Sequence, residues 1–135
     1  MHTDQQILDT FRLESSGVPI YVQIREQMLR AIGAGRMQPG QQMPTMRQVA
    51  VALRVDLNTV RHAYDELERA GAITILRARG SFVAERPPPL DPIREAARLN
   101  DLAHQAIAGA AALGVDPARL GRRIIDIAAK KAGGQ

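Results

Sequence analysis

The sequence contains no cysteine and no tryptophan, and tyrosine and phenylalanine together account for only four of its 135 residues. The absence of cysteine excludes disulfides, thiolate metal sites and cysteine nucleophiles, and it is compatible with a reducing compartment. Proteins that bind single-stranded nucleic acid stack its bases on aromatic side chains, and this chain has too few of them to form such a surface. If the partner is a nucleic acid, duplex DNA is therefore the better candidate.

Long hydrophobic runs are also absent. No apolar stretch approaches the roughly 20 residues of a membrane span, and residues 1–10 lack the charged and then apolar pattern of a signal peptide. We therefore predict a soluble, cytoplasmic protein that makes no membrane contact.

Groupings that would indicate catalysis are missing as well. The three histidines (His2, His62 and His104) do not have metal-ligand spacing, and no glycine loop of the phosphate-binding kind is present. No nucleophile lies beside a suitable base. The sequence therefore predicts neither an enzyme nor a metal or cofactor site.

Positive charge is in moderate excess. Eighteen Lys and Arg residues against fourteen Asp and Glu residues give a formal net charge of +4. An anionic partner such as DNA and an ordinary solvated basic surface explain this balance equally well. The length allows one compact domain with a modest appendage.

Changes of pattern along the chain predict four segments. They are a mobile N-terminal arm without an assigned role (1–16), a winged helix-turn-helix domain (17–84), a stiff proline-rich linker (85–91) and a two-helix tail (92–135). A short extended stretch is expected within the arm at residues 11–13. The predicted fold class is mainly α with a small β-hairpin.

Apolar residues at helical spacing predict three helices between residues 18 and 70. The second should begin at Thr45, because Thr45 and Gln48 fit a capping box in which each side chain satisfies the other's backbone N–H. The third follows after a tight turn at 54–56. This arrangement is typical of a helix-turn-helix, whose last helix enters the major groove of DNA.

The pattern then changes to that of a hairpin. Residues 72–76 and 81–84 are predicted strands, and the basic turn at 77–80 joins them. A hairpin with basic residues at its tip is a predicted wing.

Four motifs occur in order across this domain: residues 19–24 (PIYVQI), 43–50 (MPTMRQVA), 58–68 (NTVRHAYDELE) and 77–83 (RARGSFV). At this spacing they resemble the DNA-binding domain of the GntR family of bacterial regulators. Ala78 departs from the family pattern, which prefers glycine at the wing tip. Leu57 departs from it too, since relatives often have a polar or basic residue there. The short two-helix tail resembles the YtrA-type branch, in which such a tail serves dimerization.

The resemblance implies a sequence-specific transcription regulator, expected to be a repressor. It would bind a palindromic operator in double-stranded DNA as a homodimer. A small-molecule effector, which the sequence does not identify, is a separate hypothesis that rests only on the short linked architecture. The effector would bind between the winged domain and the tail. A winged-helix adaptor for another protein, or a non-specific DNA-binding protein, is the alternative.

Nine residues are predicted to contact DNA: Thr45, Arg47, Asn58, Thr59, Arg61, His62, Arg77, Arg79 and Gly80. Arg47 can reach a guanine edge or clamp a phosphate, and its structural alternative is a salt bridge to Glu66 or Glu68. For Asn58 and Thr59 the alternative is a helix cap, and for the wing arginines it is an ordinary charged turn. Tyr64 is assigned to the core, with its hydroxyl reaching the rim.

The tail helices have stripes of alanine, leucine and isoleucine that two short helices cannot bury alone. Pairing with a second copy of the chain would bury them, and packing back onto the winged domain is the alternative. The predicted dimerization residues are Ile107, Leu113, Leu120, Ile124 and Ile127.

Overall fold

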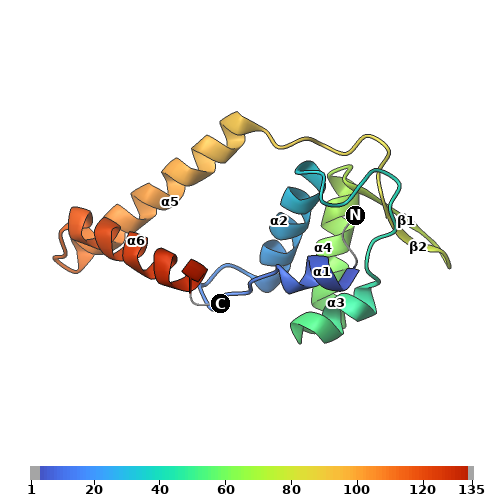
Figure 1. The fold of residues 1–135 in the computed structure, drawn as a ribbon, viewed down its shortest axis with the longest axis horizontal. Helices are drawn as coiled ribbons and strands as arrows, with labels where there is room; N and C mark the ends of the chain where they lie inside the picture. The colour runs from blue at the N-terminus through green and yellow to red at the C-terminus, as the bar shows by residue number, and fades with distance from the viewer. Residues whose placement is uncertain (1–3, 134–135) are drawn as a thin grey trace. The chain divides into compact units, whose positions relative to one another are not determined.

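The computed structural model describes residues 4–133 of the chain (Figure 1). Its contacts divide the chain into two compact units, Met1–Leu90 and Asp91–Gln135. The first three residues of the predicted arm and the last two of the predicted tail lie outside the described residues.

The first unit is mainly helical with one β-hairpin, which confirms the predicted fold class. Its elements in chain order are α1 (Asp4–Asp9), α2 (Ile20–Gly33), α3 (Met46–Leu53), α4 (Leu57–Arg69), β1 (Ile73–Leu76) and β2 (Gly80–Val83). The second unit contains α5 (Pro92–Ala112) and α6 (Pro117–Gly133).

Helix α4 is the centre of the first unit and packs against both α2 and α3 (Figure 1). One continuous side of it is buried, because its apolar residues recur at helical spacing: Val60, Ala63, Tyr64 and Leu67. Arg54 has a left-handed backbone conformation (φ 57°) directly after α3, and its N–H bonds to the carbonyl of Ala50. This residue ends α3 and turns the chain into α4.

The N-terminal stretch differs from the prediction of a mobile arm. The structure has a helix there, α1, which contacts α3. Ile7, Leu8 and Phe11 are buried in the same apolar core as the residues of α2 and α4. A helix of six residues is shorter than two turns, so its apolar residues do not repeat often enough for periodicity to be recognised in the sequence.

Two glutamine side chains of α2 fix the chain that follows α1. Gln27 accepts a hydrogen bond from the N–H of Arg12 (2.9 Å) and donates one to its carbonyl (2.8 Å). Gln23 does the same for Glu14 (2.8 and 2.9 Å). Each amide thus satisfies both backbone polar groups of one residue. The extended stretch expected at residues 11–13 forms no strand, and these side chains fix the backbone in its place.

Tyr64 joins α4 to the start of α3. Its ring is buried, and its hydroxyl donates a hydrogen bond to the carbonyl of Pro44, which is buried too. The hydroxyl therefore lies inside the core, rather than at the rim as predicted. Burial raises the pKa of the Tyr64 phenol far above its ordinary value, and the negative charge of Asp4 raises it further.

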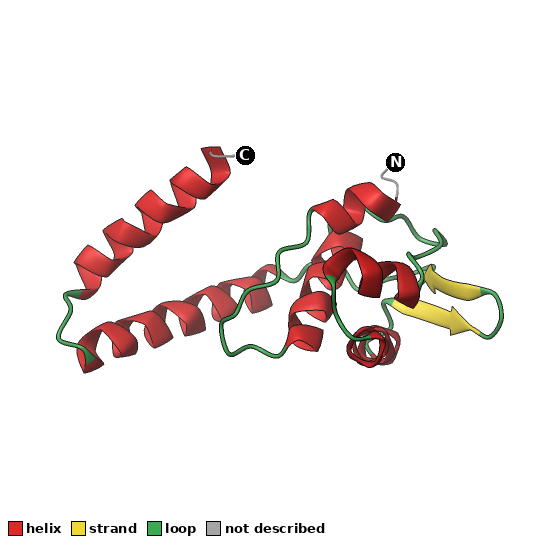
Figure 2. Ribbon diagram, turned by 90° about the horizontal axis from the view of Figure 1, so that it is seen from below, coloured by secondary structure: helices red, strands yellow, loops and turns green. Residues whose placement is uncertain are grey.

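The hairpin β1–β2 is antiparallel, with Ile73 opposite Val83 (yellow arrows in Figure 2). A segment before α3 lies along the other edge of β2. The N–H of Met43 donates to the carbonyl of Ser81 (2.7 Å), and the N–H of Val83 donates to the carbonyl of Gln41 (2.8 Å). The wing is therefore tied to the segment that leads into α3.

Both tail helices begin at an Asp-Pro pair, as predicted. Asp91 accepts a hydrogen bond from the N–H of Ile93 (3.0 Å), and Asp116 accepts one from the N–H of Ala118 (3.1 Å). The two helices contact each other, yet Ala110 is the only buried apolar residue among positions 92–133.

None of the helices within residues 4–133 combines the length and the apolar character needed to cross a bilayer.

The variant Tyr64→Phe tests the link between α4 and α3. It keeps the ring but leaves the buried Pro44 carbonyl without a partner, so we expect a loss of about 1–3 kcal/mol in the free energy of unfolding at neutral pH. Tyr21→Phe is the matched control, because the Tyr21 hydroxyl makes no hydrogen bond within residues 4–133. The control should change stability by less than about 0.5 kcal/mol in the same urea titration.

The pH dependence of the same pair of proteins tests the protonation of Tyr64. Its pKa is raised on folding, so its contribution to stability is complete below the unfolded pKa of about 10 and is lost as the pH rises above that value. The stability deficit of Tyr64→Phe relative to the wild type should therefore shrink above about pH 10. A deficit that stays constant up to about pH 11 would contradict a buried, protonated hydroxyl.

Candidate nucleic-acid interface

The first turn of α3 is exposed and capped. The Thr45 hydroxyl oxygen accepts a hydrogen bond from the N–H of Gln48 (3.0 Å), and Gln48 Oε1 accepts one from the N–H of Thr45 (2.8 Å). This confirms the predicted capping box. Arg47 lies in the same turn and is exposed, as is Thr45. A hydroxyl and a guanidinium therefore lie together at a helix end whose dipole favours anions.

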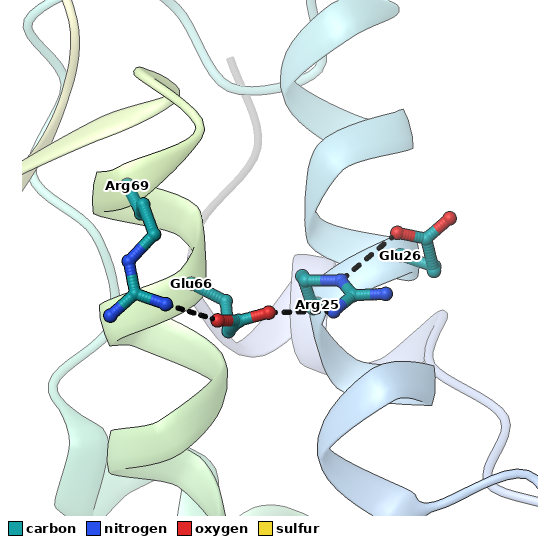
Figure 3. Close-up of polar contacts among 4 residues, drawn as sticks. All are labelled: Arg25, Glu26, Glu66 and Arg69. Carbon is teal, nitrogen blue, oxygen red and sulfur yellow. Dashed lines mark hydrogen bonds and ion pairs between the residues drawn. The ribbon is translucent and has the colours of Figure 1, made fainter.

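The carboxylates that could have paired with Arg47 have other partners. Glu66 binds Arg25 of α2 (2.9 Å) and Arg69 (3.0 Å), as Figure 3 shows. Glu68 accepts a hydrogen bond from a backbone N–H of β1 (2.8 Å). Within residues 4–133, Arg47 makes no ion pair and no side-chain hydrogen bond. Its guanidinium can therefore bind an acceptor outside the chain.

One of these ion pairs, Arg25–Glu66, connects α2 to α4. Arg25 contacts its neighbour Glu26 (3.2 Å) as well as Glu66, and both Arg25 and Glu66 are only 24% exposed (Figure 3). Partly buried charges are less screened than fully exposed ones. This contact helps to fix how α4 lies against α2.

Helix α4 turns its polar side outwards. Asn58, Arg61 and His62 are exposed, and Asn58 Oδ1 accepts a hydrogen bond from Arg61 Nη1 (2.6 Å). The N-cap of α4 is Asp56, so neither Asn58 nor Thr59 is the cap residue. Thr59 is half-buried and lies at the edge of this polar side, because its neighbours on the helix surface are exposed His62 and buried Ala63.

His62 also has a structural contact. Its ring stacks on that of Tyr21, with centroids 3.7 Å apart and planes inclined by 14°, and the Arg25 Cζ atom lies 6.0 Å from the Tyr21 ring centre. His62 therefore takes part in the contact between α2 and α4 while remaining exposed. A role for His62 in base contact stays a prediction.

The wing presents two arginines at its tip. Arg77 and Arg79 are exposed, and the N–H of Arg79 donates to the carbonyl of Leu76 (3.0 Å) to close the turn. Ala78 lies between them with a left-handed backbone (φ 66°). Glycine adopts this conformation at little cost, whereas alanine is strained in it.

Gly80 allows a close approach beside the wing turn, where β2 begins. Its φ is 109°, and a Cβ atom there would lie 3.0 Å from Nε2 of Gln42. That Gln42 amide donates a hydrogen bond to the carbonyl of Arg79 (3.3 Å). Gly80 thus has a role in wing geometry, and its contact with DNA stays a prediction.

The predicted dimerization residues leave much apolar surface uncovered in the single chain. Leu120 is half-buried, and the other four are 48–82% exposed: Ile107, Leu113, Ile124 and Ile127. Apolar residues at this density and exposure are unusual for a monomer surface.

Comparison with known proteins agrees with this geometry. The sequence profile "Bacterial regulatory proteins, gntR family" matches residues 20–83. The chain is 35% identical over 120 residues to the HTH-type transcriptional repressor YtrA of Bacillus subtilis, a match that covers 89% of this chain and 92% of YtrA. The chain belongs to the GntR family.

Solved structures of the GntR family resemble the chain along most of its length. YtrA from Sulfolobus acidocaldarius, a GntR-family transcription factor, is 29% identical with a TM-score of 0.52, and the match covers 73% of this chain and 97% of that one. A GntR family regulator from Listeria monocytogenes is 26% identical with a TM-score of 0.51, covering 84% and 98%. The chain is thus a DNA-binding transcription regulator of the winged helix-turn-helix type. Family membership also confirms the prediction that it is not an enzyme.

Three residues in or next to the GntR motifs have structural roles that sequence reasoning did not assign. Tyr21 is the stacking partner of His62, and Gln23 fixes the chain before α2. Gln42 supports the wing from just outside the motif at residues 43–50. No periodic pattern marks any of them, because each acts through a contact between distant parts of the chain.

Ala78→Gly tests the left-handed turn of the wing. We expect the free energy of unfolding to rise by about 0.5–1 kcal/mol, because glycine relieves the strain of a side chain at positive φ. The control Ala70→Gly changes an exposed alanine with φ −77° at the end of α4 and should lower stability by up to about 1 kcal/mol. Thermal unfolding of both variants measures the difference. A loss of stability with Ala78→Gly would contradict the turn described here.

Proposed function

We propose that the chain represses transcription by binding a palindromic operator in double-stranded DNA as a homodimer. The observation that carries the proposal is the exposed Arg47 guanidinium, which has no partner within residues 4–133 and lies in the capped first turn of α3. A guanidinium without a partner at a helix N-terminus can bind a phosphate. It can also donate hydrogen bonds to the O6 and N7 atoms of guanine.

The recognition helix of this proposal is α4. It follows α3 across a tight turn, which is the geometry of helices that enter the major groove. Asn58 and Arg61 form its exposed polar side and would contact base edges, with His62 beside them. Thr59 is half-buried, so we assign it a contact with the phosphate backbone at most.

The wing would add contacts beside the recognition helix. Arg77 and Arg79 are exposed at the turn that precedes β2, and β2 is hydrogen-bonded to the segment before α3. Arginines in such a position suit flanking phosphates or a narrow minor groove.

The dimer is proposed from the tail. A second copy of the chain would cover the apolar stripe of α5 and α6 that carries Ile107, Leu113, Leu120, Ile124 and Ile127, which the two helices do not bury against each other. A two-fold axis would present two recognition helices to successive major grooves, about 34 Å apart, and so would require a palindromic operator.

Repression is proposed because YtrA of Bacillus subtilis, which the chain resembles over 89% of its length, is named a transcriptional repressor. A regulator of this kind acts on bacterial DNA, so we place it in the cytoplasm. Control by a small-molecule effector stays a prediction from the sequence.

The test of operator binding is selection from a random duplex library, followed by sequencing of the retained fragments. We expect the wild type to enrich a palindrome and Arg47→Ala to bind that palindrome at least about 10-fold more weakly, since a bidentate guanine contact contributes about 1–3 kcal/mol. Arg94→Ala is the charge-matched control, because Arg94 is exposed on α5 in the tail. Binding without an enriched motif would support a non-specific DNA-binding protein, and no binding at all would support a protein adaptor.

The test of the dimer is sedimentation of tail variants. Ile124→Asp would bury a charge in the proposed interface, and we expect the dimer dissociation constant to rise at least about 100-fold. Ile125→Asp is the control, since Ile125 is also exposed but lies about 100° away around α6, off the stripe of Leu120, Ile124 and Ile127. A wild type that sediments as a monomer at micromolar concentration would contradict the proposal.

A further inference from the structure

Helix α1 lies beside the part of α3 to which we assign DNA binding. Asp4 and Gln5 of α1 line one open groove of about 610 Å³ together with Thr45 and Arg47 of α3. Helix α1 precedes the segment matched by the GntR profile, which begins at residue 20. The family motifs therefore do not account for this neighbour of Arg47.

We propose that α1 forms part of the DNA-facing surface and that the Asp4 carboxylate lowers the affinity of the protein for DNA. This inference rests on the proposed function, in which Arg47 contacts a phosphate or a base edge. A phosphate that approaches Arg47 enters the groove that Asp4 also lines. The carboxylate repels the phosphate and offsets part of the attraction of the guanidinium.

The position of α1 is fixed, so DNA cannot easily displace it. Ile7, Leu8 and Phe11 are at most 6% exposed and belong to the core shared with α2 and α4. The glutamine contacts from α2 then hold the chain directly after the helix. Moving α1 away from α3 would expose these apolar side chains to water.

The negative charge of Asp4 affects a buried group near the start of α3. Asp4 is half-buried, so its charge is less screened than that of a fully exposed side chain. Its negative charge contributes to the raised pKa of Tyr64, whose hydroxyl binds the carbonyl of Pro44 just before the α3 cap. The carboxylate charge therefore acts at the Tyr64 hydroxyl, whose partner Pro44 directly precedes Thr45.

The variant Asp4→Asn tests the inference with Asp9→Asn as its matched control. Both remove one negative charge from α1, but Asp9 is not among the groove residues and accepts a hydrogen bond from Gln5 (2.7 Å) on the exposed side of the helix. Asp4 lies in the first turn of α1, where the helix dipole favours a negative charge. Because α1 is also stabilised by burial of Ile7 and Leu8, Asp4→Asn should leave it folded. Thermal unfolding of each variant checks this.

Affinity is measured by titrating each variant with the duplex that the wild type selects. At about 50 mM salt we expect Asp4→Asn to bind roughly two- to fivefold more tightly than the wild type, and the gain to disappear near 0.5 M salt. Asp9→Asn should change affinity less than Asp4→Asn does, and Asp4→Glu should bind as the wild type does.

Two results would overturn the inference while leaving the proposed function intact. An equal gain in Asp4→Asn and Asp9→Asn would reflect net charge alone, and no gain in Asp4→Asn would place α1 away from the bound DNA. If instead Arg47→Ala binds as tightly as the wild type, the DNA-binding role of Arg47 fails, and the role of Asp4 fails with it.

Discussion

The hydrogen bond from Tyr64 to the Pro44 carbonyl joins α4, the proposed recognition helix, to the start of α3. The Tyr64 ring is buried and its pKa is raised, so the hydroxyl remains a donor throughout the ordinary pH range. Thr45 and Arg47 follow directly after Pro44, and their position relative to α4 thus depends on the core. A DNA-binding surface of two helices needs this kind of rigid link, because both helices must meet the groove together.

The remaining contacts of the winged unit support that pair of helices from several sides. The Arg25–Glu66 ion pair and the Tyr21–His62 stack connect α2 to α4, while Gln42 and the bonds along β2 connect the wing to the segment before α3. Polar side chains thus position the outward-facing residues, and apolar side chains fill the interior. The tail has the opposite character, since most of its apolar side chains are exposed in the single chain.

The elements with strong local patterns were predictable from the sequence. The stripe of α4, the Thr45–Gln48 capping box and the Asp-Pro helix starts each depend on residues a few positions apart. Helix α1 was missed because it is too short for a periodic pattern, and its stability comes from burying Ile7, Leu8 and Phe11 against distant helices. The half-buried position of Thr59 and the stacking of His62 were missed for a related reason, since both depend on how neighbouring helices pack. Whether the nine predicted residues contact DNA stays a prediction.

The central claim is that the α3–α4 face and the wing tip contact DNA. An NMR titration of the isotope-labelled full chain with its selected duplex tests this most directly. The account predicts that the largest changes in chemical shift occur at residues 45–48, in the first two turns of α4 and at residues 77–80. Changes confined to α5 and α6, with these three segments unaffected, would contradict it.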